Sequence, residues 1–351
     1  MRPGRGGAET EREQRSTLMQ LTLGYWRSQV LFAATSLGLF EALASGTTTA
    51  ESAAARCGTA PDHTGRLLNA CVALQLVERV EEGYRNTPLA ARFLAEGSDQ
   101  YLGNWVKFMG DFYGPWGRLA EAVRTGRPVD DGRGRLAAGE EYTRHIILAM
   151  HEYAMGPGRE LVSGLDLAGR RRLIDVGGGA GSYSILLAQR NPELHAVVFD
   201  LPAVVEIARD VVARHGLSSR IGVQAGDYHR DPLGNGYDVV LMSNMLHQED
   251  PASCIRLLRK AADALVDGGT LVVQLSFLNR DHTGPPWAVL QSLQLLLLYE
   301  GGRAYSTEEV LDMLPEAGFG GAQVKKLSLV GAEALIVTTK RIGGRKGPDG
   351  G

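Results

Sequence analysis

From Arg171 to Arg341 the chain alternates short apolar runs with stretches that carry apolar residues at helical spacing. The first two runs, RLIDVGG (172–178) and HAVVFDL (195–201), flank the helical stretch SYSILLAQR (182–190). Apolar runs separated by helical segments are typical of buried parallel strands joined by crossover helices. This half of the chain is therefore predicted to be α/β, with a Rossmann-like, doubly wound sheet. Further strands are expected at 221–227, 237–244, 270–278 and 334–341.

Residues 18–165 follow a different pattern, which is mostly helical. Apolar residues between Val30 and Leu43 recur at helical spacing, and the stripe ends at Gly46. Two more helical segments then precede a hairpin whose turn contains Gly83. Helix, helix and hairpin is the element order of a winged helix.

The two ends of the chain lack apolar periodicity, which is typical of disordered segments. We therefore expect a disordered N-terminus at 1–17 and a disordered tail at 342–351. Between them we expect a winged-helix-like helical domain at 18–165 and the sheet-containing domain at 166–341.

Charge and cysteine content exclude several classes of protein. The 37 basic and 40 acidic side chains leave a net charge of −3, and the candidate recognition helix at 64–76 has one Arg and no Lys. Nucleic-acid binding is not expected, because it needs a basic surface. Three cysteines without CxxC spacing favour a reducing cytoplasm. No apolar run approaches the roughly 20 residues of a membrane span.

A glycine-rich turn follows the first predicted strand. In LIDVGGGAGSYS the strand ends at Val176, the turn holds Gly177 and Gly179, and a helix begins near Ser182. Glycine permits positive φ and a close approach of the backbone to a ligand, and helix N-terminal amides face the same point. Asp175 precedes the turn. The GxGxG spacing makes a tighter cradle than a dinucleotide needs, and it suits a ligand with an amino-acid end.

Acidic residues follow the next two strands. Asp200 ends the second strand, where a carboxylate can accept both hydroxyls of a ribose. In AGDYHRD, Asp227 can accept from an adenine amino group and Tyr228 can lie against its ring. The three motifs together predict a nucleoside joined to a group smaller than a second nucleotide.

These motifs resemble those of class I S-adenosylmethionine-dependent methyltransferases that modify small natural products. With DVVLMSNMLHQEDPASC (238–254) and EGGRAYSTEEV (300–310), they are most similar to plant and bacterial O-methyltransferases with an N-terminal winged-helix dimerisation domain. The resemblance covers residues 18–341. It implies S-adenosyl-L-methionine as cofactor, a small-molecule substrate and a homodimer formed through the N-terminal domain.

By that resemblance Asp200 holds the ribose, Gly226 to Tyr228 surround the adenine, and Gly177 lies beside the methionine part. Ser243 occupies a further position on the cofactor side. The complete set expected to bind the cofactor is Asp175, Gly177, Gly179, Asp200, Leu201, Gly226, Asp227, Tyr228 and Ser243.

The same resemblance makes His247 the general base that takes a proton from a substrate hydroxyl, a task that suits a histidine pKa. In the plant enzymes two acidic residues flank this base, whereas the matching positions here are Leu275 and Ala304. The nearest substitutes for these acids in the sequence are Glu249 and Asp250, just after His247, and Glu300, just before Gly301. We expect Glu300 to assist His247 in catalysis.

The departure from the plant pattern leaves two other functions open. One is methylation of the α-carbon of a small α-keto acid, with His247 as the enolising base or as a metal ligand. A lone His without a second ligand at metal-binding spacing predicts no metal site. The other is a regulatory protein that binds the cofactor without catalysis.

Substrate contacts are expected from apolar and polar side chains near the predicted site. Met155 lies in HEYAMGPG, Trp287 and Gln294 share a helical segment, and Arg303 follows a Gly pair. An apolar lining with a few polar groups is typical of a pocket for a small substrate.

Overall fold

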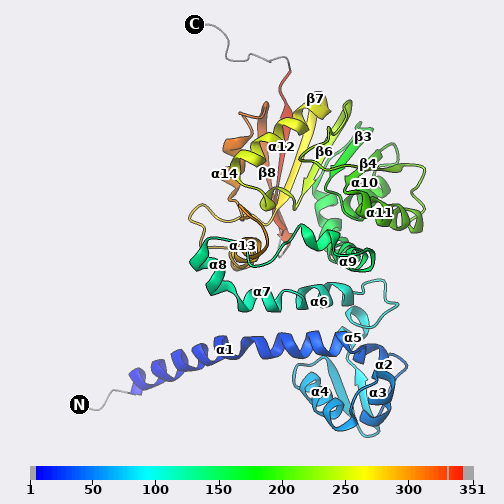
Figure 1. Ribbon diagram of the computed structural model, residues 1–351, viewed down its shortest axis with the longest axis vertical. Coiled ribbons are helices and arrows are strands. Elements are labelled where there is room, and N and C mark those ends of the chain that lie inside the picture. The colour runs from blue at the N-terminus through cyan, green and yellow to red at the C-terminus, as the bar shows by residue number, and fades with distance from the viewer. Residues whose placement is uncertain (1–4, 330–331, 343–351) are drawn as a thin grey trace. The chain divides into compact units, whose positions relative to one another are not determined.

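The computed structural model describes residues 5–329 and 332–342, and its contacts separate into two compact units between Asp111 and Phe112 (Figure 1). The domain boundary was predicted near residue 165, which is later in the chain than this division. Helix α9 (Glu140–Gly164) accounts for part of the difference, because its Leu161 is buried in the same apolar cluster as the sheet, and residues 129–132 account for more, because they bond to the backbone of Leu297 and Leu298. Within the described residues, no helix combines the length and the apolar character needed to span a membrane.

The first unit contains six helices among its described residues and one two-stranded antiparallel hairpin. Helices α3 (Ala50–Cys57) and α4 (Pro61–Ala73) precede the hairpin in the chain, which is the predicted winged-helix order. Phe40 and Leu68 are fully buried in its core. The elements are α1 (Arg5–Ser36), α2 (Leu39–Ala42), α3 (Ala50–Cys57), α4 (Pro61–Ala73), β1 (Val77–Val80), β2 (Gly83–Asn86), α5 (Pro88–Phe93) and α6 (Gly103–Gly110).

Helix α1 corrects the expectation that residues 1–17 are disordered, because it begins at Arg5. The segment AETEREQR lacks an apolar stripe, but it consists almost entirely of residues with high helix propensity. Propensity and continuation from the packed part of α1 explain the helix. The disordered tail predicted at 342–351 lies outside the described residues, apart from Ile342.

The second unit consists of a seven-stranded sheet with helices on both faces (Figure 1). Its helices are α7 (Tyr113–Gly117), α8 (Leu119–Thr125), η1 (Gly134–Ala137), α9, α10 (Ser182–Arg190), α11 (Pro202–Arg214), η2 (Leu246–Gln248), α12 (Pro251–Ala264), α13 (Pro286–Leu298) and α14 (Thr307–Met313). Its strands are β3 (Arg172–Val176), β4 (His195–Asp200), β5 (Ile221–Ala225), β6 (Tyr237–Ser243), β7 (Leu265–Leu275), β8 (Phe319–Leu329) and β9 (Ala332–Lys340).

The sheet has the strand order β5-β4-β3-β6-β7-β9-β8. Strands β3 to β7 are parallel, and β9 pairs antiparallel with both β7 and β8. The predicted strands are all present. Strand β8 was not predicted, because FGGAQVKKLSL is rich in Gly and Lys and lies at the sheet edge, where the apolar signal of a buried strand is absent.

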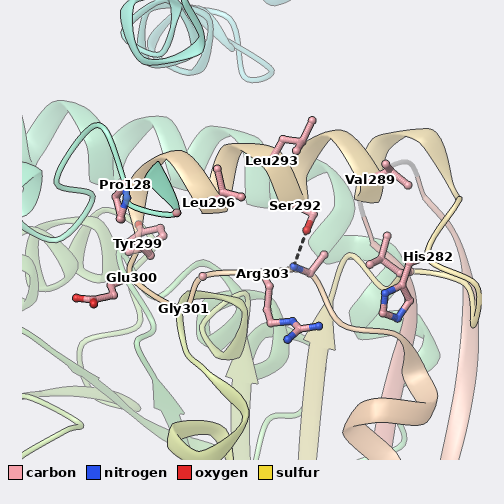
Figure 2. A pocket seen from close by; sticks show the side chains of 14 residues that line it. Pro128, His282, Val289, Ser292, Leu293, Leu296, Tyr299, Glu300, Gly301 and Arg303 are labelled. Atoms are coloured by element: carbon pink, nitrogen blue, oxygen red, sulfur yellow. Dashed lines mark hydrogen bonds between the residues drawn. The ribbon is translucent and has the colours of Figure 1, made fainter. Parts of the chain in front are cut away.

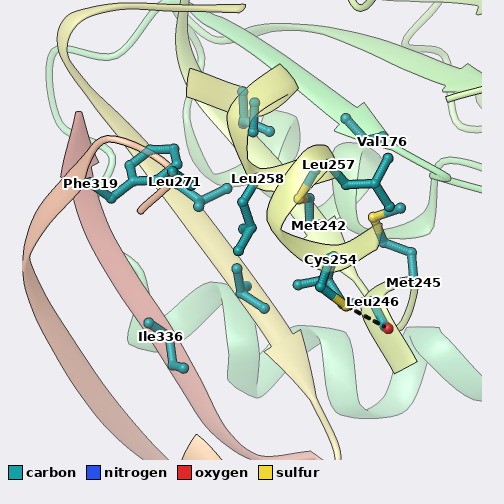
Figure 3. Close-up of a cluster of buried hydrophobic side chains, with 14 of the residues drawn as sticks. Val176, Met242, Met245, Leu246, Cys254, Leu257, Leu258, Leu271, Phe319 and Ile336 are labelled. Atoms are coloured by element: carbon teal, nitrogen blue, oxygen red, sulfur yellow. Dashed lines mark hydrogen bonds between the residues drawn. The ribbon is translucent and has the colours of Figure 1, made fainter. Parts of the chain in front are cut away.

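Two apolar clusters fill the layers on either side of this sheet. One face packs against α9, α10 and α11, and the other against α12 and α14. Figure 3 shows the second layer, in which Leu257 and Leu258 of α12 lie against Met242 of β6 and Leu271 of β7. Burial of the sheet on both faces explains the nearly continuous apolar runs of its strands.

Candidate functional site

The chain reverses its strand order at β3, which lies between β4 and β6. Ligands of open α/β sheets bind outside the carboxyl ends of the strands at such a point. The glycine turn leaves β3 here, with Gly177 at φ 66° and Gly179 at φ 56°. A Cβ atom on Gly177 would lie 3.6 Å from the Cβ atom of Met245, which follows β6. The turn and the segment after β6 therefore face each other.

Asp200, at the end of β4, holds this glycine turn. Its Oδ2 atom accepts a hydrogen bond from the backbone N–H of Gly179 at 2.8 Å, and its Oδ1 atom accepts one from Leu201 at 2.7 Å. Burial raises the pKa of Asp200, while the two N–H groups oppose the shift. A carboxylate has about four lone-pair sites, so each oxygen retains capacity for a ligand hydroxyl.

Asp175 lies beneath the turn. It is 1% exposed, and its Oδ2 atom accepts a hydrogen bond from the Ser184 hydroxyl at 2.9 Å. Burial raises the pKa of Asp175 to about 7; the Ser184 hydrogen bond opposes that rise, and the charge of Asp200 adds to it. The Oδ1 atom is buried and has no hydrogen-bond partner among the residues that the structure describes, so it remains an unused acceptor at the base of the turn.

The segment after β5 is joined to the same strand ends. The backbone N–H of Gly226 donates to the carbonyl of Asp200 at 2.9 Å. The carboxylate of Asp227 accepts from the backbone N–H of His229 at 2.9 Å, so this side chain already closes a local turn. The Tyr228 hydroxyl donates to Oε1 of Glu249 at 3.3 Å, and burial, followed by the charge of Glu249, raises the pKa of this tyrosine.

A polar cluster lies at the end of β6, and it joins the predicted Ser243 to two residues that were not predicted, Asn244 and Gln274. The Ser243 hydroxyl and the Asn244 amide both donate to Oε1 of Gln274, at 2.6 and 2.9 Å. Among the described residues, the Oδ1 atom of Asn244 and the Nε2 atom of Gln274 are buried without hydrogen-bond partners. An acceptor and a donor left unpaired in this way indicate a polar ligand beside them. Asn244 has φ 52°, a left-handed conformation that Asn adopts more readily than most residues. An Asn directly after a predicted strand was the sequence signal that could have indicated this cluster.

His247 lies in η2, directly after this cluster, and is 8% exposed. Burial lowers its pKa to about 4, so the imidazole is neutral at physiological pH. In the described part of the chain Nδ1 is buried without a hydrogen-bond partner. The backbone carbonyl of His247 accepts from the N–H of Arg303 at 2.9 Å.

The three acidic residues expected to substitute for the plant acids are engaged elsewhere or exposed. Asp250 caps α12 by accepting from the backbone N–H and the hydroxyl of Ser253. Glu249 is bonded by Arg133, among others. Glu300 is exposed. Because Nδ1 of His247 has no hydrogen-bond partner within the described ranges, the structure does not place Glu300 in contact with this nitrogen, and assistance from Glu300 stays a prediction.

A cavity of about 530 Å³ lies between α13 and the segment that follows it (Figure 2). Val289, Leu293 and Leu296 line it from α13, and Glu300 and Arg303 line it from the facing segment. The Ser292 hydroxyl accepts a hydrogen bond from the backbone N–H of Ala304 at 3.2 Å and joins the two walls. This cavity thus combines an apolar wall with charged groups.

Of the four residues predicted to contact substrate, Arg303 alone lines this cavity. Trp287 and Gln294 lie on α13 but are not among the residues that line the cavity. Met155 lies on α9 and packs against the apolar cluster between α9 and the sheet. The guanidinium of Arg303 lies 3.5 Å from the carboxylate of Glu309. Within the residues described, no group of three or more His, Cys, Asp or Glu is arranged to hold a metal ion.

Comparison with known proteins finds two family matches and a set of related enzymes. Residues 116–320 match the O-methyltransferase domain family, and residues 19–96 match the O-methyltransferase dimerisation domain. The 3-hydroxy-5-methyl-1-naphthoate 3-O-methyltransferase of Streptomyces sahachiroi is 36% identical over 328 residues, or 92% of this chain and 94% of that protein. The N,N-dimethyltransferase OxyT of Streptomyces rimosus is 32% identical over 338 residues, or 93% of this chain and 97% of that protein.

A solved structure shares both the fold and the extent of the chain. The crystal structure of human N-acetylserotonin methyltransferase in complex with S-adenosylmethionine superimposes with a TM-score of 0.87 at 30% identity. The match covers 94% of this chain and 98% of the human one. The glycine turn, the open acceptor positions of Asp200 and the unpaired polar atoms after β6 fit that cofactor. The chain belongs to the S-adenosylmethionine-dependent O-methyltransferase family.

Proposed function

We propose that this protein methylates a hydroxyl group on a small, largely apolar aromatic molecule, with His247 as the general base. The observation that carries the proposal is the neutral, buried imidazole of His247 beside the cofactor-side segments. A general base must be unprotonated at working pH, and burial ensures this here. The related naphthoate enzyme is named for methylation of an aromatic hydroxyl, which supports the substrate class.

Cofactor binding is assigned to the strand ends. Asp200 accepts from the ribose hydroxyls, while Gly226, Asp227 and Tyr228 contact the adenine. When bound, S-adenosylmethionine supplies a methyl group carried on a positively charged sulfur. The remaining cofactor-binding residues in this proposal hold the methionine part or its surroundings; they are Asp175, Gly177, Gly179, Leu201 and Ser243.

His247 acts in this proposal without an acidic partner on Nδ1. The main chain of His247 is instead held by the backbone N–H of Arg303, which donates to the His247 carbonyl. Two residues after His247, the Glu249 carbonyl accepts a hydrogen bond from the Tyr305 hydroxyl at 2.6 Å. These bonds orient the segment that carries the ring. The imidazole accepts the proton of the substrate hydroxyl, and the low-water surroundings favour transfer between correctly placed groups.

Substrate recognition is assigned to Met155, Trp287, Gln294 and Arg303. Three of these side chains supply apolar or neutral polar surface, and Arg303 supplies a positive charge on the wall of the cavity. An aromatic substrate that carries an acidic group would use both features. This assignment follows from composition and position.

The protein is also proposed to form a homodimer through its first unit, which contains the dimerisation-domain match. Helix α1 exposes a run of large apolar side chains, and its Leu21 is 76% exposed. Leu18, Leu21 and Tyr25 are spaced by three and four residues, so they share one helix face. Such a face on an otherwise charged helix favours burial against a second chain.

A side-by-side substrate panel tests the reaction. Purified protein is given S-adenosylmethionine with a hydroxynaphthoate, simple phenols, aromatic amines and enolisable α-keto acids, each with and without a chelator. We expect methyl ethers of phenols, insensitive to chelator. Carbon-methylated keto acids would instead establish the alternative reaction, and no product despite S-adenosylhomocysteine binding would favour a regulatory protein.

His247→Asn tests the role of the base. We expect kcat to fall by about two to four orders of magnitude, the usual contribution of general-base catalysis, while S-adenosylhomocysteine binds within threefold of wild type, about 0.7 kcal/mol. The same measurement on Glu300→Gln tests the predicted assistance from Glu300, whose side chain is exposed. A fall in kcat in this variant would support that assistance. Unchanged kcat in His247→Asn would overturn the assignment.

A further inference from the structure

Glu249 is a buried carboxylate that the proposed reaction does not use. It is 4% exposed, and its Oε1 atom lies close to polar atoms of three side chains. The Arg133 guanidinium is 2.5 Å away, His229 Nε2 is 3.1 Å away, and the Tyr228 hydroxyl is 3.3 Å away. A charge taken out of water to this extent is retained only where it is paired, so this oxygen has a defined role in the structure.

The three side chains around Oε1 come from segments far apart in the chain. Tyr228 and His229 follow β5, on the side of the site assigned to the adenine, whereas Arg133 precedes η1. Glu249 itself follows η2, and its carbonyl is fixed by the Tyr305 hydroxyl. One side chain thus joins the segment after β5 to the segment around Arg133.

The backbone around Arg133 is anchored independently of this ion pair. The N–H groups of Val129 and Asp130 donate to the carbonyl of Leu297, at 3.0 and 3.1 Å, and Gly132 donates to Leu298 at 3.0 Å. These carbonyls lie at the C-terminal end of α13, where helix carbonyls lack partners within the helix. Arg133 therefore reaches Glu249 from a fixed backbone.

We propose that Glu249 is a positioning residue that, held by Arg133, fixes the ring of Tyr228 for adenine binding. The inference rests on the proposed placement of the adenine beside Tyr228. Without the carboxylate, the Tyr228 hydroxyl loses its acceptor in a half-buried site and its ring loses a fixed orientation. Arg133 is 52% exposed at its side chain and regains water instead. The effect of losing Glu249 therefore falls on Tyr228.

The role predicts a change in cofactor affinity rather than in chemistry. None of the described hydrogen bonds of the Glu249 carboxylate goes to His247. The hydrogen bond of the Glu249 carbonyl to Tyr305 is made by the main chain and survives side-chain substitution. Losing Glu249 should raise KM for S-adenosylmethionine and leave kcat at saturation nearly unchanged.

Calorimetric titration with S-adenosylhomocysteine tests this on the full chain. Glu249→Leu should weaken binding about tenfold, as expected for loss of a charge-assisted hydrogen bond, and Arg133→Met should weaken it less. Glu249→Gln keeps an acceptor for Tyr228 and should recover most of the affinity. Arg259→Met is the matched control, because Arg259 is equally exposed at 52% and pairs with Glu316.

Two further measurements separate positioning of Tyr228 from a general structural role. Tyr228→Phe should cause no additional loss in the Glu249→Leu background, because both changes remove the same hydrogen bond. 5′-Methylthioadenosine, which keeps the adenine and ribose, should lose affinity by the same factor as S-adenosylhomocysteine. If Glu249→Leu does not fold, Tyr228→Phe and Arg133→Met carry the test.

Several outcomes would overturn the proposal. Unchanged affinity in Glu249→Leu, or in both Tyr228→Phe and Arg133→Met, removes the link to the cofactor. A fall in kcat with unchanged affinity places Glu249 with the base instead. Additive losses in the double variant mean that the carboxylate acts on something other than Tyr228. If the wild-type protein fails to bind S-adenosylhomocysteine, the proposed function fails first, and that result is distinct from the others.

Discussion

The carboxylate of Asp200 accepts a hydrogen bond from the backbone N–H of Gly179 at 2.8 Å, so the end of β4 holds the turn that follows β3. We predict that Asp200→Ala raises the Kd for S-adenosylhomocysteine about a hundredfold, or about 2.7 kcal/mol, because the turn loses its support and the ribose its acceptor. Isothermal titration calorimetry measures this directly.

Asp238→Ala is the matched control for Asp200→Ala. The Asp238 carboxylate also accepts two backbone N–H groups, from Arg171 and Arg172, at 2.7 and 2.8 Å, but at the opposite end of the strands. We expect this variant to lose stability and keep its affinity for S-adenosylhomocysteine. Equal loss of affinity in the two variants would show that Asp200 acts through the fold alone.

Gly179→Ala tests the glycine turn against a glycine of the same conformation. Gly179 has φ 56° and Gly216 has φ 68°, and a Cβ atom on either would meet no atom within 4 Å. Both substitutions should therefore destabilise the fold by about 1 kcal/mol through the left-handed backbone alone. Gly179→Ala should in addition lose S-adenosylhomocysteine affinity, because the new methyl occupies ligand space. If the two variants bind equally, the turn does not contact the ligand.

Position along a strand explains which parts of this site could be predicted from the sequence. Asp175, Gly177 and Asp200 lie at the carboxyl ends of consecutive parallel strands, so the strand pattern alone brings them to one edge of the sheet. Glu249 and Arg133 are 116 positions apart, and no spacing rule relates them. Their pairing depends on how one loop docks on the end of α13.

The environment of His247 could not be predicted for a similar reason. Glu300 is near the site in sequence, yet it is exposed on the cavity wall, and Nδ1 of His247 has no hydrogen-bond partner in the part of the chain that the structure describes. Distance along the sequence limits how far apart two residues can lie, but it does not determine where their side chains point. The direction of a side chain on a loop depends on the packing around it. The buried unpaired atoms of Asn244 and Gln274 were likewise visible only once both strands were in place.

Leu21→Asp tests the homodimer. A charge on the exposed apolar face of α1 should oppose the burial of this face against a second chain. An unpaired charge in an interface costs several kcal/mol of binding free energy, on the order of the loss caused by removing a central contact residue. Light scattering should report a mass that falls from twice 37.7 kDa to 37.7 kDa. Val266→Asp, an exposed apolar residue of β7, is the control and should leave the mass unchanged. A dimer that persists in Leu21→Asp would exclude this face.

The pKa of His247 predicts how stability depends on pH. Burial lowers this pKa from its ordinary 6.5 to about 4, so between these values the unfolded chain binds a proton that the native protein does not. The free energy of unfolding should therefore decrease as pH falls from 6.5 toward 4, by up to about 3 kcal/mol from this residue. Urea unfolding at several pH values measures the slope, and His247→Gln should make it shallower.

Other buried groups change the slope in known directions, so the difference between variant and wild type is the informative quantity. Burial, aided by the charges of His215 and Arg214, lowers the pKa of His151 to about 4, which adds to the loss of stability at acidic pH. The raised pKa of Asp175 acts in the opposite direction, because it favours the native state as pH falls from about 7. These contributions are common to both proteins and cancel in the difference. An identical slope in His247→Gln would mean that the imidazole is not held neutral.

The same pKa predicts the acid limb of the pH–rate profile. The value of kcat/KM reports ionisations of the free enzyme, so a base with a pKa of about 4 should leave kcat/KM independent of its titration down to about pH 5. A water-exposed histidine would instead halve the rate near its ordinary pKa of about 6.5. The profile should be measured with a phenol whose own pKa lies well above 8, so that ionisation of the substrate does not shape this limb. A midpoint near 6.5 would show that the base titrates in contact with water, and the burial of His247 would then not govern its protonation during turnover.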